Sequence, residues 1–157
     1  MFEEMLQKQN LAQLRAVVEK LAARIEAPES VLPTYGASEN SARPHIEIDG
    51  RYHFVVVERG LELQRRTTTD LDEILYWIFD DVTSSLASKY EVRNRKPDED
   101  SRRLLFGKQV ALMAQLNERW AGRCESELRE VLAGHPFVDE GGQTITRLAP
   151  HLPHTLH

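Results

Sequence analysis

Apolar residues recur every three or four positions in the first part of the chain, which is the spacing of one helix face. These residues are Leu14, Val17, Val18, Leu21 and Ile25. The spacing predicts a helix over residues 2–27, ended by Pro28. Residues 29–44 contain prolines, Gly36 and several small polar residues, so we expect a surface connection there, anchored by Tyr35.

The pattern then changes to strict alternation, which is typical of strands. Ile46 and Ile48 alternate with acids, and Gly50 with Arg51 offers a two-residue turn. Two further alternating runs follow, at 52–56 and 61–64, with a break at Gly60. Because connections this short cannot form parallel crossovers, we predict a three-stranded antiparallel meander.

Helical spacing returns over residues 70–93, where Asp70 can cap the start and Glu73 can reach back in a capping box. The predicted buried stripe comprises Leu71, Ile74, Leu75, Ile78, Val82 and Leu86. Glu73, Tyr76 and Asp80 point the opposite way, with Trp77 beside them. This helix is therefore apolar on more than one side. Either it lies between the sheet and another helix, or Tyr76 and Trp77 belong to a binding patch.

A charged break at 93–100 separates this helix from a long helical pattern that ends at Gly134. Asn117 could cap a restart, so one bent helix or two helices are both compatible with the pattern. The predicted fold is α+β: an N-terminal helix, a three-stranded antiparallel sheet, and long C-terminal helices packed on one sheet face. We expect a single domain over residues 1–137 and a loosely ordered tail over 138–157.

Composition narrows the function classes without naming one. The chain has 157 residues, 41% of them hydrophobic and 29% charged, and a formal charge of −5. That sign disfavours a protein that neutralises nucleic-acid phosphates and favours a basic partner. Cys124 is the only cysteine, and the N-terminus carries acids where a signal peptide needs positive charge. We expect a cytoplasmic protein with no membrane span.

No enzyme motif is complete in this sequence. His45-Ile-Glu47 resembles half of a zinc deaminase signature, but the Pro-Cys-x-x-Cys half is absent. Neither Gly-x-Ser-x-Gly nor a phosphate-binding glycine loop occurs. His151, His154 and His157 have metal-ligand spacing but lie in the predicted tail, and the acids at 98–100 are better explained as helix caps. We therefore predict neither catalysis nor a cofactor or metal.

Five basic side chains between residues 93 and 103 form what we call the basic group. They are Arg93, Arg95, Lys96, Arg102 and Arg103. The alternative function is a small regulatory domain that binds nucleic acid through this group. The group has no interleaved aromatics, so a solvated face paired to nearby carboxylates is the favoured interpretation.

The sharper hypothesis is a protein-binding patch, because aromatic anchors surrounded by acids can engage a cationic surface. The predicted contact residues are Glu73, Tyr76, Trp77 and Asp80 on the helix, with Glu58 and Glu62 on the sheet. If the two aromatics instead pack under the long C-terminal helix, the interface would fall to the outer face of the sheet. The exposed acids there would be Glu47, Asp49, Glu58 and Glu62.

An ordered set of short segments resembles the immunity protein 63 family of bacterial polymorphic toxin systems. The segments are Leu32-Pro-Thr-Tyr-Gly36, Arg43-Pro-His-Ile-Glu-Ile-Asp49, Tyr52-His-Phe-Val-Val-Val-Glu-Arg-Gly60, Asp70-Leu-Asp-Glu-Ile-Leu-Tyr-Trp-Ile-Phe79, Asp100-Ser-Arg-Arg-Leu-Leu-Phe106 and His135-Pro-Phe137. The resemblance covers residues 32–137. It implies a cytoplasmic antidote that binds a cognate toxin domain, for instance a nuclease with a basic cleft. It supplies no catalytic or toxin-contacting residues, and a homodimer is compatible with exposed Tyr76 and Trp77.

Overall fold

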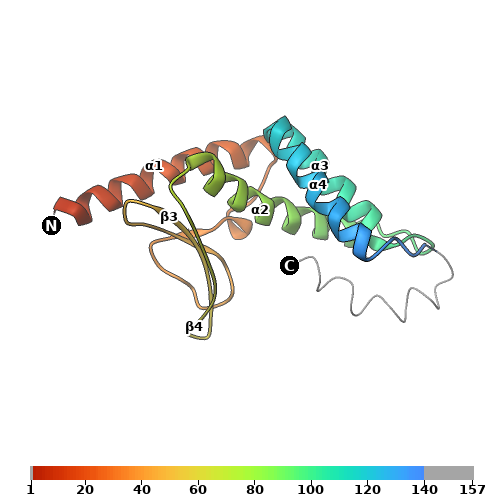
Figure 1. Ribbon diagram of the computed structural model, residues 1–157, viewed down its shortest axis with the longest axis horizontal. Helices are drawn as coiled ribbons and strands as arrows, with labels where there is room; N and C mark the ends of the chain where they lie inside the picture. Colours follow the sequence, from red (N-terminus) through yellow and green to blue (C-terminus); the bar gives the residue numbers. More distant parts are fainter. Residues whose placement is uncertain (1, 140–157) are drawn as a thin grey trace. The chain divides into compact units, whose positions relative to one another are not determined.

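Four α-helices, a short 3-10 helix and four strands make up residues 2–139, the part of the chain that the computed structural model describes (Figure 1). Their contacts cluster into two compact units that divide between Val82 and Thr83. The α+β class is confirmed. The packing of the C-terminal helices on the sheet and the single domain over 1–137 stay predictions.

The first unit begins with helix α1 (Phe2–Arg24), which contacts strand β2 of the sheet. Leu14, Val18 and Ala22 are buried at a spacing of four, as the helical pattern predicts. The helix ends before Pro28 because Glu26 adopts a left-handed backbone with φ of 53°. Ala27 N then donates to Ala22 O at 3.0 Å, which satisfies a carbonyl of the last turn.

The sheet has one strand more than predicted. Strands β2 (His45–Ile48), β3 (Tyr52–Glu58) and β4 (Leu61–Thr68) form the expected antiparallel meander. Strand β1 (Thr34–Tyr35), which follows the 3-10 helix η1 (Glu29–Val31), adds to it in parallel with β2. Two residues cannot display an alternating pattern, so this strand was not predictable from periodicity.

The β3–β4 hairpin turns on Arg59 and Gly60, which have φ of 52° and 79°. Two left-handed residues in a two-residue loop give the turn whose twist suits a hairpin. The pairing register then shifts between Val56 and Val57, so Leu63 of β4 has no Cα partner in β3. Strand β4 is an edge of the sheet, and most of its side chains are exposed.

Helix α2 (Leu71–Arg93) begins in the first unit and ends in the second. Its predicted start is confirmed, because Asp72 N donates to Asp70 Oδ1 at 3.0 Å. The second unit continues with α3 (Ser101–Leu116) and α4 (Glu118–Gly134), which lie side by side (Figure 1). Asn117 separates them with an extended backbone, and its side chain accepts from the N–H groups of Arg119 and Trp120. Of the two possibilities, two helices is the correct one.

A buried ion pair in the second unit connects the start of α3 to the segment that follows α4. Arg102 and Asp100 are 1% and 5% exposed, and their closest N–O distance is 2.8 Å. The Arg102 guanidinium also donates to the carbonyls of His135 and Pro136, at 2.7 and 2.8 Å. Val138 N donates to Asp100 at 3.0 Å, so the chain is held up to the point where the tail was predicted to begin. Residues 140–157 of that predicted tail lie outside the described residues.

Candidate functional site

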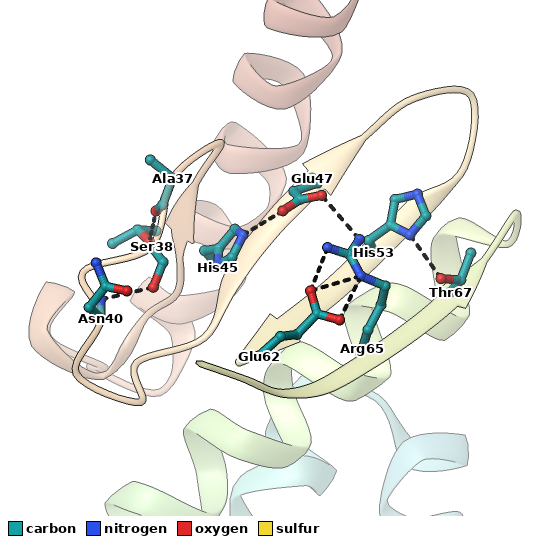
Figure 2. A network of polar contacts seen from close by, with 10 residues as sticks. Ala37, Ser38, Asn40, His45, Glu47, His53, Glu62, Arg65 and Thr67 are labelled. Carbon is teal, nitrogen blue, oxygen red and sulfur yellow. Dashed lines mark hydrogen bonds and ion pairs between the residues drawn. The ribbon is translucent and has the colours of Figure 1, made fainter. Parts of the chain in front are cut away.

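One face of the sheet carries a connected set of polar side chains (Figure 2). The strand register places His45 and Glu47 of β2 on the same face as His53 of β3 and Arg65 of β4. The opposite face is apolar in its centre, where Ile46 pairs with Phe54 and both are buried. The polar face is the outer sheet face that the sequence offered as the alternative interface.

Arg65 lies at the centre of this polar face. Its guanidinium donates to Glu62 at 2.8 Å and to Glu47 at 3.1 Å, so it bridges two strands (Figure 2). Hydrogen bonds from Arg65 hold the pKa of Glu62 below its usual value. Burial raises the pKa of Glu47, but hydrogen bonds from His45 and Arg65 outweigh it, and the net shift is downward. Both acids therefore stay ionised at neutral pH and are fixed in position.

Two buried histidines form hydrogen bonds with acids of this face. His45 is 3% exposed, and its Nε2 lies 2.7 Å from Glu47 Oε2. His53 is similarly buried, with Nε2 at 2.7 Å from Asp49 Oδ1 and Nδ1 at 2.8 Å from the Thr67 hydroxyl. The hydrogen bond from His53 lowers the pKa of Asp49. Sequence analysis identified the acids, but it considered His45 only as half of a metal motif and did not single out His53. The available signal was that His45 and Glu47 are two residues apart, which places them on one face of a strand.

The predicted helix patch on α2 is divided between interior and surface. Tyr76 is 1% exposed and therefore lies in the interior. Trp77 is half-buried and contacts Arg66, whose guanidinium lies 4.9 Å from the Trp77 ring and 5.0 Å from the Phe54 ring. Trp77 thus joins α2 to the apolar side of the sheet. Tyr76 is therefore not exposed for a partner, and packing of the two aromatics under the C-terminal helix stays a prediction.

The acids predicted on α2, Glu73 and Asp80, are both half-buried. The sheet acids Glu58 and Glu62 are exposed on β3 and β4, close to the hairpin turn. Glu62 pairs with Val57 on the polar face, so alternation along β3 places Glu58 on the opposite face. The structure therefore brings Glu62 together with Glu47, whereas Glu73 and Asp80 lie on a different element. Sequence analysis did not single out Asp81, whose pKa burial and the neighbouring Asp80 raise to about 6, although Arg66 opposes the shift.

The basic group is mostly engaged in ion pairs within the second unit. Arg95 pairs with Glu91 at 2.8 Å and Lys96 with Glu99 at 3.6 Å. Arg102 is buried against Asp100, and Arg103 pairs with Asp139 at 2.6 Å. Paired and buried cations are poorly placed to neutralise phosphates, so this geometry favours the structural interpretation of the group.

Comparison with known proteins identifies the family. The family model described as Immunity protein 63 matches residues 49–130, just over half of the chain. The chain belongs to the immunity protein 63 family. No curated protein and no solved structure matches it. The matched range is shorter than the 32–137 expected from the resemblance.

The immunity protein 63 match runs from the β2–β3 turn into α4. It contains every predicted contact residue on β3, β4 and α2, whereas His45 and Glu47 precede it. Among the described residues of this family member, no group of three or more potential ligands is arranged to hold a metal ion. The described helices include none that is both long and apolar enough to cross a membrane.

Proposed function

We propose that this immunity protein 63 family member acts in the cytoplasm, where it binds a cognate bacterial toxin domain and neutralises it by stoichiometric occlusion. The observation that carries the proposal is the polar sheet face in a chain of this family. Its acids are ionised, held by Arg65 and partly exposed, with side-chain exposures of 38% for Glu47 and 46% for Glu62. Two carboxylates share the single Arg65 cation, so the cluster keeps an excess of negative charge, and its fixed side chains lose little entropy on binding a basic partner.

A toxin with a basic cleft, such as a nuclease, fits this face best. The chain carries a net charge of −5, which adds a weak long-range attraction to the same kind of partner. Glu73, Trp77 and Asp80 on α2 are a second candidate surface for the toxin. Tyr76 is not part of that candidate because its side chain is buried.

The first experiment is affinity capture of the tagged protein from its native cells at moderate salt, with mass spectrometry of the proteins that co-elute. The captured toxin domain is then expressed in a laboratory bacterium with and without this protein. Equal stoichiometry and restored growth would support the proposal. A toxin-producing culture from which nothing co-elutes, or that this protein fails to protect, would contradict it.

The surface is tested by neutralising charges in pairs. Glu47→Gln with Glu62→Gln should slow association and flatten its dependence on salt, while the matched control Glu118→Gln with Glu130→Gln on α4 should do neither. Glu73→Lys with Asp80→Lys tests the α2 candidate in the same assay. Unchanged affinity and salt dependence in either pair would remove that surface from the interface.

A further inference from the structure

The two buried histidines of the polar face differ in what their second ring nitrogen contacts (Figure 2). His45 Nε2 lies 2.7 Å from a Glu47 oxygen. His53 Nε2 lies 2.7 Å from Asp49 Oδ1. His53 Nδ1 lies 2.8 Å from the Thr67 hydroxyl, whereas His45 Nδ1 is buried and has no hydrogen-bond partner among the described residues. This difference decides how many protons each ring can hold inside the fold.

The neutral form of both rings is compatible with these contacts. A carboxylate is only an acceptor, so Nε2 carries the proton, and the Thr67 hydroxyl donates to Nδ1 of His53. A second proton turns Nδ1 into a donor. The Thr67 hydroxyl can rotate and accept this hydrogen bond, because a hydroxyl is both donor and acceptor. In His45 the same proton would be a buried donor without an acceptor, which is costly.

The charged and polar groups that face His53 come from the two neighbouring strands and the β2–β3 turn. They are Glu47 on β2, Arg65 and Thr67 on β4, and Asp49 and Arg51 in the turn. Helix α2 meets the opposite face through Trp77, and α1 meets it beside Ile48. Asp49 and Thr67 are in hydrogen-bond contact with the ring, so they are the groups that respond first to its protonation.

We infer that His53 takes up a proton as the pH falls from about 8 to 5, that His45 does not, and that the polar face loses negative charge over this range. For the toxin this rests on the proposed function, since a less negative face should associate more slowly with a basic partner. The hydrogen bond from His53 lowers the pKa of Asp49, so that carboxylate stays ionised over the same range. One unit charge about 6 Å away in water changes association by about threefold at low salt.

Proton uptake is measured without the toxin, from the ring nitrogen signals of the isotopically labelled full chain between about pH 8 and 5. The Nδ1 signal of His53 should move to the protonated position while the amide spectrum remains that of a folded chain. The His45 ring should keep one proton throughout. A His53 ring that stays neutral over the whole range, or a His45 ring that titrates with it, would overturn the inference.

The role of the hydroxyl is tested at Thr67. Thr67→Val keeps the branched shape and removes the acceptor, so the titration midpoint of His53 should fall by about one pH unit. Thr67→Ser restores a hydroxyl and should restore the midpoint. Thr69→Val is the matched control, because Thr69 is an exposed threonine just after β4, and it should leave the midpoint unchanged. Equal midpoints in Thr67→Val and wild type would overturn the assignment.

The consequence for the toxin is measured as the decrease in its association rate between about pH 7.5 and 6, at low salt. The two proteins compared, with threonine or valine at position 67, both carry Asp81→Asn, because burial raises the pKa of Asp81 to about 6 and its charge would otherwise change too. The toxin's own titration is common to both. Association should slow by up to about threefold with Thr67 and by less with Thr67→Val.

The two ways of failing are distinguishable. Equal decreases in the two proteins would contradict the regulation of toxin binding by His53. Wild-type protein that fails to bind the toxin at either pH would contradict the proposed function itself. Proton uptake by His53 is decided by the ring signals in either case, because that measurement needs no toxin.

Discussion

Replacing Arg102 by methionine should strongly destabilise the second unit. Its guanidinium donates to both carboxylate oxygens of Asp100, at 3.2 and 2.8 Å, and to two backbone carbonyls of the segment after α4. Arg102→Met leaves the Asp100 charge buried with only the backbone N–H groups of Arg102 and Val138 as donors. Breaking a buried pair from one side costs about 3–5 kcal/mol of unfolding free energy.

The neighbouring arginine is a matched control. Arg103 pairs with Asp139 at 2.6 Å, but the two side chains are 42% and 38% exposed. Exposed pairs contribute about 0–1 kcal/mol, so Arg103→Met should cost little by comparison. Asp100→Asn combined with Arg102→Met should be less destabilised than Arg102→Met alone, because no unpaired charge remains buried.

Urea unfolding followed by Trp120 fluorescence measures this effect in the unit concerned. Trp120 is buried in α4, and a Trp77→Phe background removes the signal from the first unit. Burial raises the pKa of Asp100, but hydrogen bonds from Arg102 and Val138 outweigh it and lower the pKa overall. The stability from this pair is therefore present above about pH 4 and is lost as the pH falls further. Equal losses in Arg102→Met and Arg103→Met would refute the reasoning.

Three further outcomes follow from the same geometry. Burial raises the pKa of Asp81 to about 6 in the folded state, whereas an aspartate in the unfolded chain has a pKa of about 4. Folding therefore takes up a proton between these two pH values, and the unfolding free energy falls as the pH rises through that window. Asp81→Asn should remove this dependence and raise the unfolding free energy at pH 7 by up to roughly 3 kcal/mol in pH-dependent urea melts; an unchanged pH profile would contradict it. Fluorescence anisotropy at low salt should detect no binding of duplex DNA or RNA, whereas a steep salt-dependent curve would return the basic group to consideration. Cys124 is 1% exposed, so a thiol reagent should modify it only after unfolding, and rapid reaction in native buffer would count against the burial.

Long periodic segments were predictable from the sequence because their patterns are local. Helix α2 and the β2–β4 meander follow directly from spacing, and the Asn117 cap was recognisable although its consequence was open. The failures involve partners that are distant in sequence. Val17 was predicted on the same helix face as Leu14 and Val18, yet it is 38% exposed whereas they are buried.

Burial of polar and aromatic side chains was harder still. Tyr76 and Trp77 are adjacent and chemically similar, yet Tyr76 is buried whereas Trp77 is half-buried and contacts Arg66. Arg102 was grouped with solvated cations because its carbonyl acceptors lie more than thirty residues away. The contacts of Arg65 with Glu47 and Glu62 could not be predicted either, because they depend on the strand register.

The geometry of the second unit also separates the residues that maintain the fold from those proposed to bind the toxin. Two of the segments that carried the family resemblance, 100–106 and 135–137, meet there, because Arg102 donates to the His135 and Pro136 carbonyls and lies 5.6 Å from the Phe137 ring. These segments stabilise a helical scaffold. The sheet acids Glu47 and Glu62 belong to the first unit and are partly exposed. Scaffold variants should therefore lower the unfolding free energy without changing the salt dependence of toxin association, and surface variants should do the opposite.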